Sequence, residues 1–397
     1  MKNMKFSSLS LRLAMPLAFS LLAISLLGGC NGAARAPKTL MLAMTNDPAT
    51  LDPAKAYDTA SLPFVRVLYR GLVDYDEKAN IANEVAQSRS VSSDGKTYTF
   101  KLRPDVYFSS GRRVVANDFR YALERVLDPA TASEGLSQYT MIDGAEEYTK
   151  AKTKNAKADV HVRGIQTPDA NTIIFRLKAP NATFLNYLAL PFSYAVPREQ
   201  VEKYGKEFGE HPDGCGPFVL DEWVHDAWIK LKRNPNHFRP DFPRADRLEM
   251  QIGVSSTLQT MLFEQGRIDV LSLNGASGPE YLRLKRNPQW APLLLHAPEM
   301  DVRYLCLNTE MKPFDDVRVR QAMNYAINRD RIVSFQNGRA TKARGALPPG
   351  MPAYNAQLFQ YAYNPEKAKQ LLREAGYAKG FPRILTLWYS NASPWIP

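Results

Sequence analysis

Polar and apolar residues alternate most clearly between Thr97 and Arg103. The apolar members of this stretch share one side: Tyr98, Phe100 and Leu102. A period of two predicts a half-buried β-strand. Ser93, Asp94 and Gly95 precede it and supply turn chemistry, since Asp bonds its own downstream backbone and Gly tolerates positive φ. Residues 89–103 are therefore predicted to form a hairpin.

The spacing becomes helical after Gly111. Apolar residues recur at i, i+3, i+4, i+7 and i+8, at Phe119, Ala122, Leu123, Val126 and Leu127. Asn117 is the predicted N-cap and Pro129 the predicted stop. The stretch 84–129 therefore reads as a complete strand, turn and helix unit.

The same patterns extend along the rest of the chain. Further strands are predicted at 39–44, 171–177, 218–220, 227–232, 267–272, 303–307 and 384–389. Further helices are predicted at 59–72, 257–266, from 314 onward with Asp315 or Asp316 as cap, and at 364–375. Strands interspersed with helices indicate mixed sheets flanked by helices.

Five stretches resemble, in order, the oligopeptide and dipeptide family of solute-binding proteins that serve ABC importers. They are DPATLDPAKAYD at 47–58, the unit at 84–129, CGPFVLDEW with LKRNPNHF at 215–238, LCLNTEMKPFDDVRVRQAMNYAINRDRI at 305–332 and YNPEKAKQLLREAGY at 363–377. The resemblance covers residue 40 to the end. It implies a binding protein, not an enzyme, that closes two lobes around a peptide and passes it to a membrane permease and its ATPase.

The fold that the resemblance implies is α/β, of the type II periplasmic-binding-protein kind, bilobal with mixed sheets flanked by helices and an extra small lobe. Residues 38–72 and 180–333 would form the first lobe, residues 73–179 the small inserted lobe, and residues 334–397 the start of an incomplete second lobe. In the family, the acidic residue that pairs with the ligand's α-amine lies in the part of the second lobe beyond residue 397. It is therefore assigned to no position in this chain.

The resemblance also indicates where a ligand would lie. The first strand of the family ends at the cleft, so the turn Asn46, Asp47, Pro48 and Ala49 is a candidate wall of the site; an ordinary surface turn is the alternative. Tyr139 stands where the family has a cleft-facing aromatic residue, although a core tyrosine would fit the pattern equally.

Five further residues complete the candidate site. Cys215 and Gly216 open a strand, and the family's usual Thr is replaced by Cys215, which removes a hydroxyl. Tyr304 lies in the predicted strand 303–307, which Asn308 and Thr309 close, and a strand-end amide suits an extended peptide backbone. The arginines at 318, 320 and 329 could clamp a carboxylate or form a solvated helix face.

The first 29 residues are typical of an export signal. Lys2, Lys5 and Arg12 precede an apolar stretch from Leu13 to Leu27, too short and too interrupted for a membrane span. Leu27-Gly28-Gly29-Cys30 resembles a lipobox, so Cys30 is the expected lipidation site at a membrane, in the periplasm or at the cell surface; cleavage without lipidation is the alternative. Residues 30–37 would be a tether.

Charge and cysteine content narrow the functional classes. The chain of 397 residues carries a formal charge of +11, which falls to +8 when the three basic residues of the leader are removed. The basic residues are dispersed, so nucleic acid is not expected as a partner. Cys215 and Cys306 lack a metal-binding spacing, and two separate thiols are favoured over a bridge.

No cofactor or metal is expected, and a monomer is expected. No HExxH, GxSxG, P-loop or GxGxxG pattern occurs in the sequence, although a dispersed Ser/His/Asp triad would leave no such pattern. Two alternatives to a working peptide receptor therefore stay open. One is a truncated relic or surface interaction fragment, and the other is an extracellular hydrolase.

Overall fold

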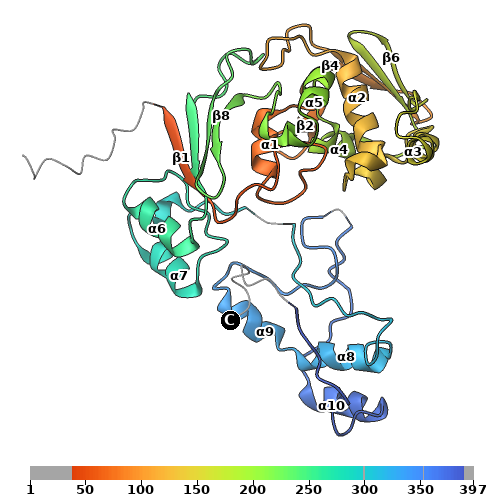
Figure 1. The fold of residues 1–397 in the computed structure, drawn as a ribbon. Coiled ribbons are helices and arrows are strands. Elements are labelled where there is room, and N and C mark those ends of the chain that lie inside the picture. Colours follow the sequence, from red (N-terminus) through yellow and green to blue (C-terminus); the bar gives the residue numbers. More distant parts are fainter. Residues whose placement is uncertain (1–37, 298–299, 352, 389–397) are drawn as a thin grey trace, which may run out of the picture. The chain divides into compact units, whose positions relative to one another are not determined.

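A computed structural model of the chain describes residues 38–297, 300–351 and 353–388, in two compact units (Figure 1). The first contains residues 38–255 and 262–270, and the second residues 256–261 and 271–388. The predicted leader, Cys30, the tether and the end of the strand expected at 384–389 lie outside the described residues.

The first unit contains a four-stranded sheet in the order β1-β10-β9-β8. Its strands are β1 (Thr39–Ala43), β8 (Phe218–Val224), β9 (Trp228–Arg233) and β10 (Arg247–Gln251). β1 runs parallel to β10, while the other neighbours are antiparallel. The core side of the sheet carries Ile229, Leu231 and Leu248, which pack with Phe64 and Leu68 of α1 (Leu62–Leu68). A mixed sheet flanked by helices agrees with the predicted α/β class.

A second four-stranded sheet has the order β4-β5-β7-β6, all antiparallel. Its strands are β4 (Ala86–Val91), β5 (Thr97–Leu102), β6 (Ile165–Asp169) and β7 (Thr172–Arg176). The predicted alternation in β5 is confirmed, because Tyr98, Phe100 and Leu102 are buried. These residues join one apolar cluster with Phe119 and Leu123 of α2 (Ala116–Leu127). The predicted hairpin and its helix are therefore both present.

The start of α2 corrects one detail of the prediction. Asn117 is not the N-cap, because the helix already begins at Ala116. Asp118 reaches back instead, and its Oδ2 accepts the main-chain N–H of Val115 at 2.8 Å. A carboxylate in the first turn also suits the positive end of the helix dipole.

Smaller elements complete the first unit. They are β2 (Val73–Tyr75), β3 (Ile81–Asn83), α3 (Ala145–Lys154), α4 (Phe184–Leu188), α5 (Arg198–Tyr204) and four 3₁₀ turns, η1 (Pro129–Thr131), η2 (Leu136–Tyr139), η3 (Pro191–Ser193) and η4 (Gly205–Glu210). α6 (Ser256–Glu264) contributes residues to both units.

The regular elements in the described part of the second unit are helices. It contains α7 (Gly278–Arg286), η5 (Ala291–Leu293), α8 (Val317–Ala326), α9 (Arg329–Phe335) and α10 (Pro365–Glu374). Asp316 caps α8 by accepting the Arg318 N–H, and Asn364 caps α10 by accepting the Lys367 N–H. Ala322 of α8 packs with Ala368 and Leu371 of α10, which is the stripe predicted from the spacing.

Three predicted strands are absent from the described residues: 267–272, 303–307 and the described part of 384–389. A strand needs a hydrogen-bonded neighbour, and none of these stretches has a ladder. The first stretch contacts β1 through Asp269, whose N–H donates to the Met41 carbonyl at 2.8 Å. The Met41 N–H donates in turn to the Asp269 carboxylate at 2.6 Å. Alternation of apolar and polar residues alone therefore did not predict these strands correctly.

Candidate functional site

The segment that follows β1 is held at both ends by the first unit. The Met44 N–H donates to the Gln251 carbonyl at 2.8 Å, and the Val254 N–H donates to the Met44 carbonyl at 3.0 Å. Farther along, the Ala49 N–H donates to the Ser61 hydroxyl at 3.0 Å. The predicted wall residues 46–49 therefore lie in a fixed turn beyond the carboxyl end of β1.

The four predicted wall residues differ in their exposure to solvent. Asn46 and Ala49 are exposed, Asp47 is half-buried and Pro48 is buried. The Asn46 amide has no hydrogen-bond partner in the part of the chain that the structure describes. It is thus a donor and an acceptor available to a ligand.

Asp47 is engaged by the hairpin turn between β8 and β9. Its carboxylate accepts the Trp223 indole N–H at 3.0 Å and the Asp226 main-chain N–H at 3.3 Å. His225 Nδ1 lies 2.6 Å from the same carboxylate, and His225 Nε2 lies 3.3 Å from Glu210. The sequence pattern gives no sign of these partners, because they are separated from Asp47 by more than 160 positions.

Cys215 and Gly216 are held from inside the protein. The Gly216 N–H donates to the Leu68 carbonyl at 2.9 Å, and Asn234 Nδ2 donates to the Gly216 carbonyl at 2.8 Å. His237 Nδ1 lies 3.2 Å from the Cys215 carbonyl. A Cβ on Gly216 would collide with the backbone of Val67 and Leu68. Glycine therefore allows these two backbone segments of the protein to pack closely.

Cys215 does not expose its side chain to a ligand. The residue is fully buried, and burial raises the pKa of its thiol to about 12. The thiol therefore stays protonated and unreactive near neutral pH. Cys215 and Cys306 are both free, as expected; Cys306 is exposed.

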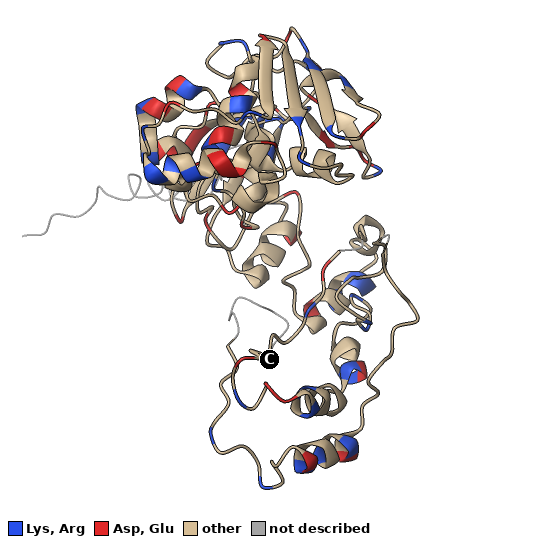
Figure 2. Cartoon of the chain, turned by 90° about the vertical axis from the view of Figure 1, so that its right-hand side faces the viewer, with Lys and Arg blue, Asp and Glu red and all other residues tan. Residues whose placement is uncertain are grey.

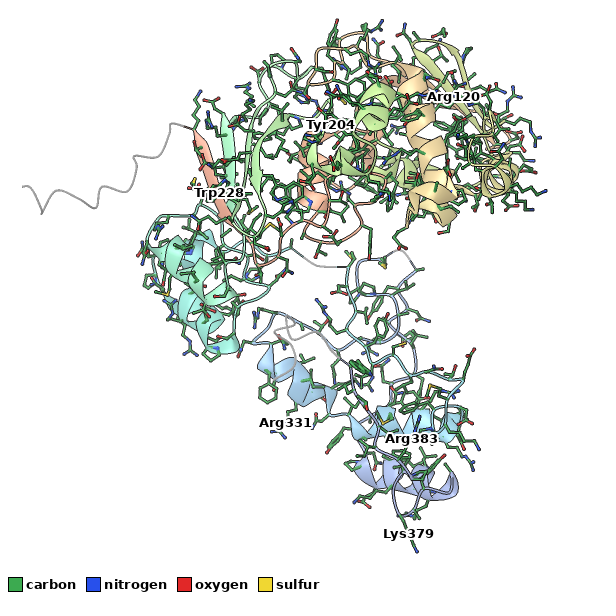
Figure 3. The ribbon with its side chains drawn as sticks, in the orientation of Figure 1. Arg120, Tyr204, Trp228, Arg331, Lys379 and Arg383 are labelled. Atoms are coloured by element: carbon green, nitrogen blue, oxygen red, sulfur yellow. The ribbon has the colours of Figure 1, made fainter. Side chains whose placement is uncertain are left out.

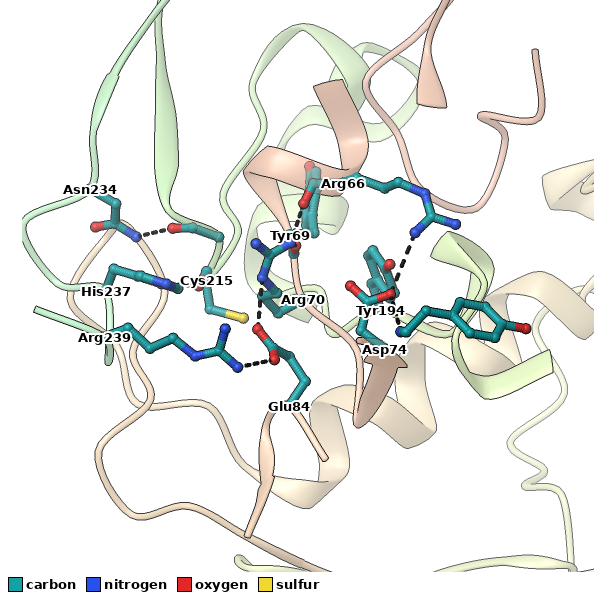
Figure 4. Close-up of polar contacts among 12 residues, drawn as sticks. Arg66, Tyr69, Arg70, Asp74, Glu84, Tyr194, Cys215, Asn234, His237 and Arg239 are labelled. Atoms are coloured by element: carbon teal, nitrogen blue, oxygen red, sulfur yellow. Dashed lines mark hydrogen bonds and ion pairs between the residues drawn. The ribbon is translucent and has the colours of Figure 1, made fainter. Parts of the chain in front are cut away.

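An ionic cluster of Arg70, Glu84 and Arg239 lies beside Cys215 (Figure 4), with Arg70 and Glu84 buried and Arg239 partly exposed. Glu84 Oε1 lies 3.0 Å from Arg70 Nε, and Glu84 Oε2 pairs with Arg239. Burial raises the pKa of Glu84, while the two guanidinium groups oppose that rise. The cluster joins three distant parts of the chain and is a structural feature that the sequence patterns did not indicate.

Tyr139 corrects the expectation of a cleft-facing aromatic residue. Its side chain has no exposed surface, and its hydroxyl donates to the Tyr187 carbonyl at 2.8 Å. Tyr139 belongs to the apolar cluster that contains Phe100 and Phe119. It therefore acts in packing, the alternative that the pattern also allowed.

The remaining predicted residues lie in the second unit, in a stretch without strand structure. Tyr304 is 79% exposed, and Asn308 and Thr309 are exposed. The Asn308 side-chain oxygen accepts the Glu310 N–H at 3.0 Å, which forms a local turn. The structure thus groups residues 46–49 in one turn, keeps Cys215 and Gly216 in the core of the same unit, and leaves the other three in a different unit.

Two features are absent from the residues that the structure describes. Residues 38–297, 300–351 and 353–388 contain no group of three or more His, Cys, Asp or Glu side chains suited to a metal ion. None of the helices within these ranges combines the length and apolar character of a membrane span. Figure 2 shows acidic and basic residues intermingled along the chain.

Comparison with known proteins identifies the family. Residues 80–396 match the bacterial extracellular solute-binding proteins, family 5 (middle). The glutathione-binding protein GsiB of Escherichia coli O1:K1 is 33% identical over 371 residues, which cover 93% of this chain and 67% of that protein. The chain thus spans about two thirds of the length of this relative.

Solved structures agree with the sequence match. A periplasmic oligopeptide-binding protein from Borrelia burgdorferi superposes with a TM-score of 0.76 at 27% identity, covering 87% of this chain and 68% of that one. The Escherichia coli murein tripeptide-binding protein MppA gives 0.76 at 26% identity, covering 86% and 67%. DppA of Helicobacter pylori, solved with the peptide STSA, gives 0.71 at 27% identity, covering 86% and 67%. These matches confirm the predicted fold class, and the chain belongs to the family 5 bacterial extracellular solute-binding proteins.

Proposed function

We propose that this chain is the substrate-binding component of an ABC importer, which captures small peptides and delivers them to a membrane permease and its ATPase. The observation that carries the proposal is the match of 93% of the chain to a glutathione-binding protein, supported by structural likeness to peptide-binding proteins. Glutathione is itself a tripeptide. Ligands with a short peptide backbone are therefore the first class to test.

The turn at 46–49 is the proposed contact surface of the first unit. Asn46 offers an amide without a partner among the described residues, and an amide pairs well with the main chain of an extended peptide. Asp47 is half-buried and already has three partners, so its role would be to fix the turn. In the second unit, Tyr304, Asn308 and Thr309 are exposed, and each is proposed as a ligand contact of that unit.

The proposal includes export and anchoring. Cys30 would carry lipid, which would hold a monomeric receptor at the membrane in the periplasm or at the cell surface. Nucleic acid, cofactors and catalysis have no part in this function. Metabolic labelling with a radioactive fatty acid tests the anchor: the chain should take up label, and a Cys30→Ser variant should not.

A second candidate is a surface interaction protein that holds no ligand by itself. Exposed apolar side chains in the second unit favour it: Leu295 is 97% exposed, Ile384 92% and Trp388 90%. A contiguous patch formed by such side chains would mark a place where another protein binds. Such a protein would associate with partners but would carry no peptide.

Native mass spectrometry separates the two candidates. The chain is exported from a bacterial host, purified without denaturation and weighed intact. The peptide-receptor account predicts additional masses of a few hundred daltons that disappear after mild unfolding. Detection of the bare chain alone, in a preparation that folds cooperatively, would favour the second candidate.

A further inference from the structure

His225 lies where three elements of the first unit meet. It belongs to the turn between β8 and β9, and its Nδ1 lies 2.6 Å from Asp47 Oδ2 in the segment after β1. Its Nε2 lies 3.3 Å from Glu210 Oε2, at the end of η4. One imidazole ring therefore touches two carboxylates on different elements.

Both contacts are favourable together only when the ring is protonated. A carboxylate accepts hydrogen bonds, and a neutral imidazole has a single N–H, whereas imidazolium has two. The charged groups around the ring are acidic: Asp47, Glu210 and the neighbouring Asp226. The hydrogen bond that the His225 ring donates to the Asp47 carboxylate is the largest cause that raises the pKa of His225, opposed by partial burial.

Asp47 links the protonation of His225 to the candidate binding turn 46–49. Its other oxygen accepts the Trp223 indole N–H at 3.0 Å, and the Trp223 ring centre lies 4.3 Å from that of His225. Asp226 adopts a φ of 58°, so the hairpin turn bends back and points its own N–H at Asp47. Asn46 is the residue before Asp47 and leaves its amide free of partners within the described part of the chain.

We propose that His225 is a proton-dependent positioning residue, which bridges Asp47 and Glu210 and so holds the binding turn 46–49 against the β8–β9 hairpin. Loss of the proton leaves one N–H for two carboxylates. The Glu210 contact then becomes repulsive and the hold on Asp47 weakens. The inference rests on the proposed function, because it assumes that residues 46–49 contact the ligand.

Binding measured against pH tests the inference. Glutathione and the tetrapeptide Ser-Thr-Ser-Ala serve as probes in calorimetric titrations of the purified chain from pH 5.5 to 8.5. Wild-type affinity should fall about two- to fivefold as pH rises, the range expected for an exposed ion pair. His225→Gln should flatten the profile, since its amide donates without titrating. His211→Gln, which removes an exposed histidine that stacks on Tyr204, should keep the wild-type profile.

A ligand-free readout keeps this test separate from the proposed function. The NMR signal of the Trp223 indole N–H should titrate with a midpoint above pH 6.5, and His225→Gln should abolish that titration. A titrating Trp223 in a chain that binds neither probe supports the bridge and contradicts the proposed receptor function. A Trp223 signal that does not titrate, or identical binding profiles in wild type and His225→Gln, overturns the inference.

Discussion

Arg125 and Asp52 form a two-pronged ion pair in the first unit, with Nη1 and Nη2 at 2.7 and 2.5 Å from the two carboxylate oxygens. The Arg125 side chain is 11% exposed and that of Asp52 4%. The pair joins α2 to the segment after β1, just beyond the candidate binding turn. It thus couples the parts of the chain that carry the two apolar clusters.

Removal of one partner should be severe, because it leaves the other charge buried and unpaired. Arg125→Ala is expected to lower the free energy of unfolding by about 3–5 kcal/mol. Arg198→Ala is the matched control: its pair with Glu202 is exposed, and its loss should cost about 0.3–0.5 kcal/mol. Urea unfolding measures both. Similar losses for the two variants would show that the Asp52 pair is not effectively buried.

Gly216 should tolerate no side chain. A Cβ there meets the backbone of Val67 and Leu68, which cannot move as a flexible side chain would. Gly216→Ala should therefore lower the free energy of unfolding by about 3 kcal/mol or more. Gly266→Ala, at a φ of +68° in open space, should lose only about 1–2 kcal/mol from backbone strain. Urea unfolding would contradict this account if the two variants ranked in the opposite order.

His237 should make the fold sensitive to acid. Burial lowers the pKa of this residue to about 4, and nearby Arg70 and Arg239 oppose its protonation. Between pH 6.5 and 4 the unfolded chain binds the proton and the folded chain does not, so the free energy of unfolding falls as pH drops through this window. The loss attributable to His237 should approach about 3 kcal/mol.

The comparison of variants isolates this contribution. His237→Gln should show a weaker fall in stability between pH 6.5 and 4 than wild type, whereas His211→Gln should behave as wild type. Urea unfolding at several pH values supplies the measurement. The same pH dependence in wild type and His237→Gln would show that other groups, for instance carboxylates, cause the acid sensitivity.

Asn46 should matter for binding and not for folding. Loss of one hydrogen bond to a ligand costs about 0.5–1.5 kcal/mol, so Asn46→Ala should weaken peptide affinity about two- to tenfold. Asn117→Ala, another exposed asparagine in the first unit, is the control and should bind as wild type. Calorimetric titration with glutathione measures both. Unchanged affinity for Asn46→Ala would remove this residue from the site.

Local features of the fold could be predicted from the sequence. The β4–β5 hairpin, the face of β5, the length of α2 and the cap of α8 depend on residues within a few positions of one another. Strand predictions failed at 267–272 and 303–307, where apolar alternation has no neighbouring ladder in the described residues. A strand depends on its partner, which can lie far away in sequence: β1 pairs with β10 some 200 positions later.

The candidate site was harder to predict for the same reason. The turn at 46–49 could be located because prolines and a strand end mark it. Tyr139 looked equally suited to a cleft and to a core, and only its burial decided the matter. The bridge from His225 to Asp47 and Glu210 left no local signal, and neither did the cluster around Glu84.

Trp228 (Figure 3), at the start of β9, is 39% exposed although aromatic residues in strands are usually core residues.

Thermal unfolding of the purified chain with and without peptide tests the central claim most directly. Glutathione and Ser-Thr-Ser-Ala are added in turn to the same preparation. A ligand that binds only the folded chain must raise the unfolding midpoint, by an amount that corresponds to about 2.7 kcal/mol at a hundredfold excess over Kd. The account predicts a cooperative transition that moves upward with at least one of these probes. A cooperative transition that neither probe moves, at any concentration up to millimolar, would contradict the assignment of this chain as a working peptide receptor.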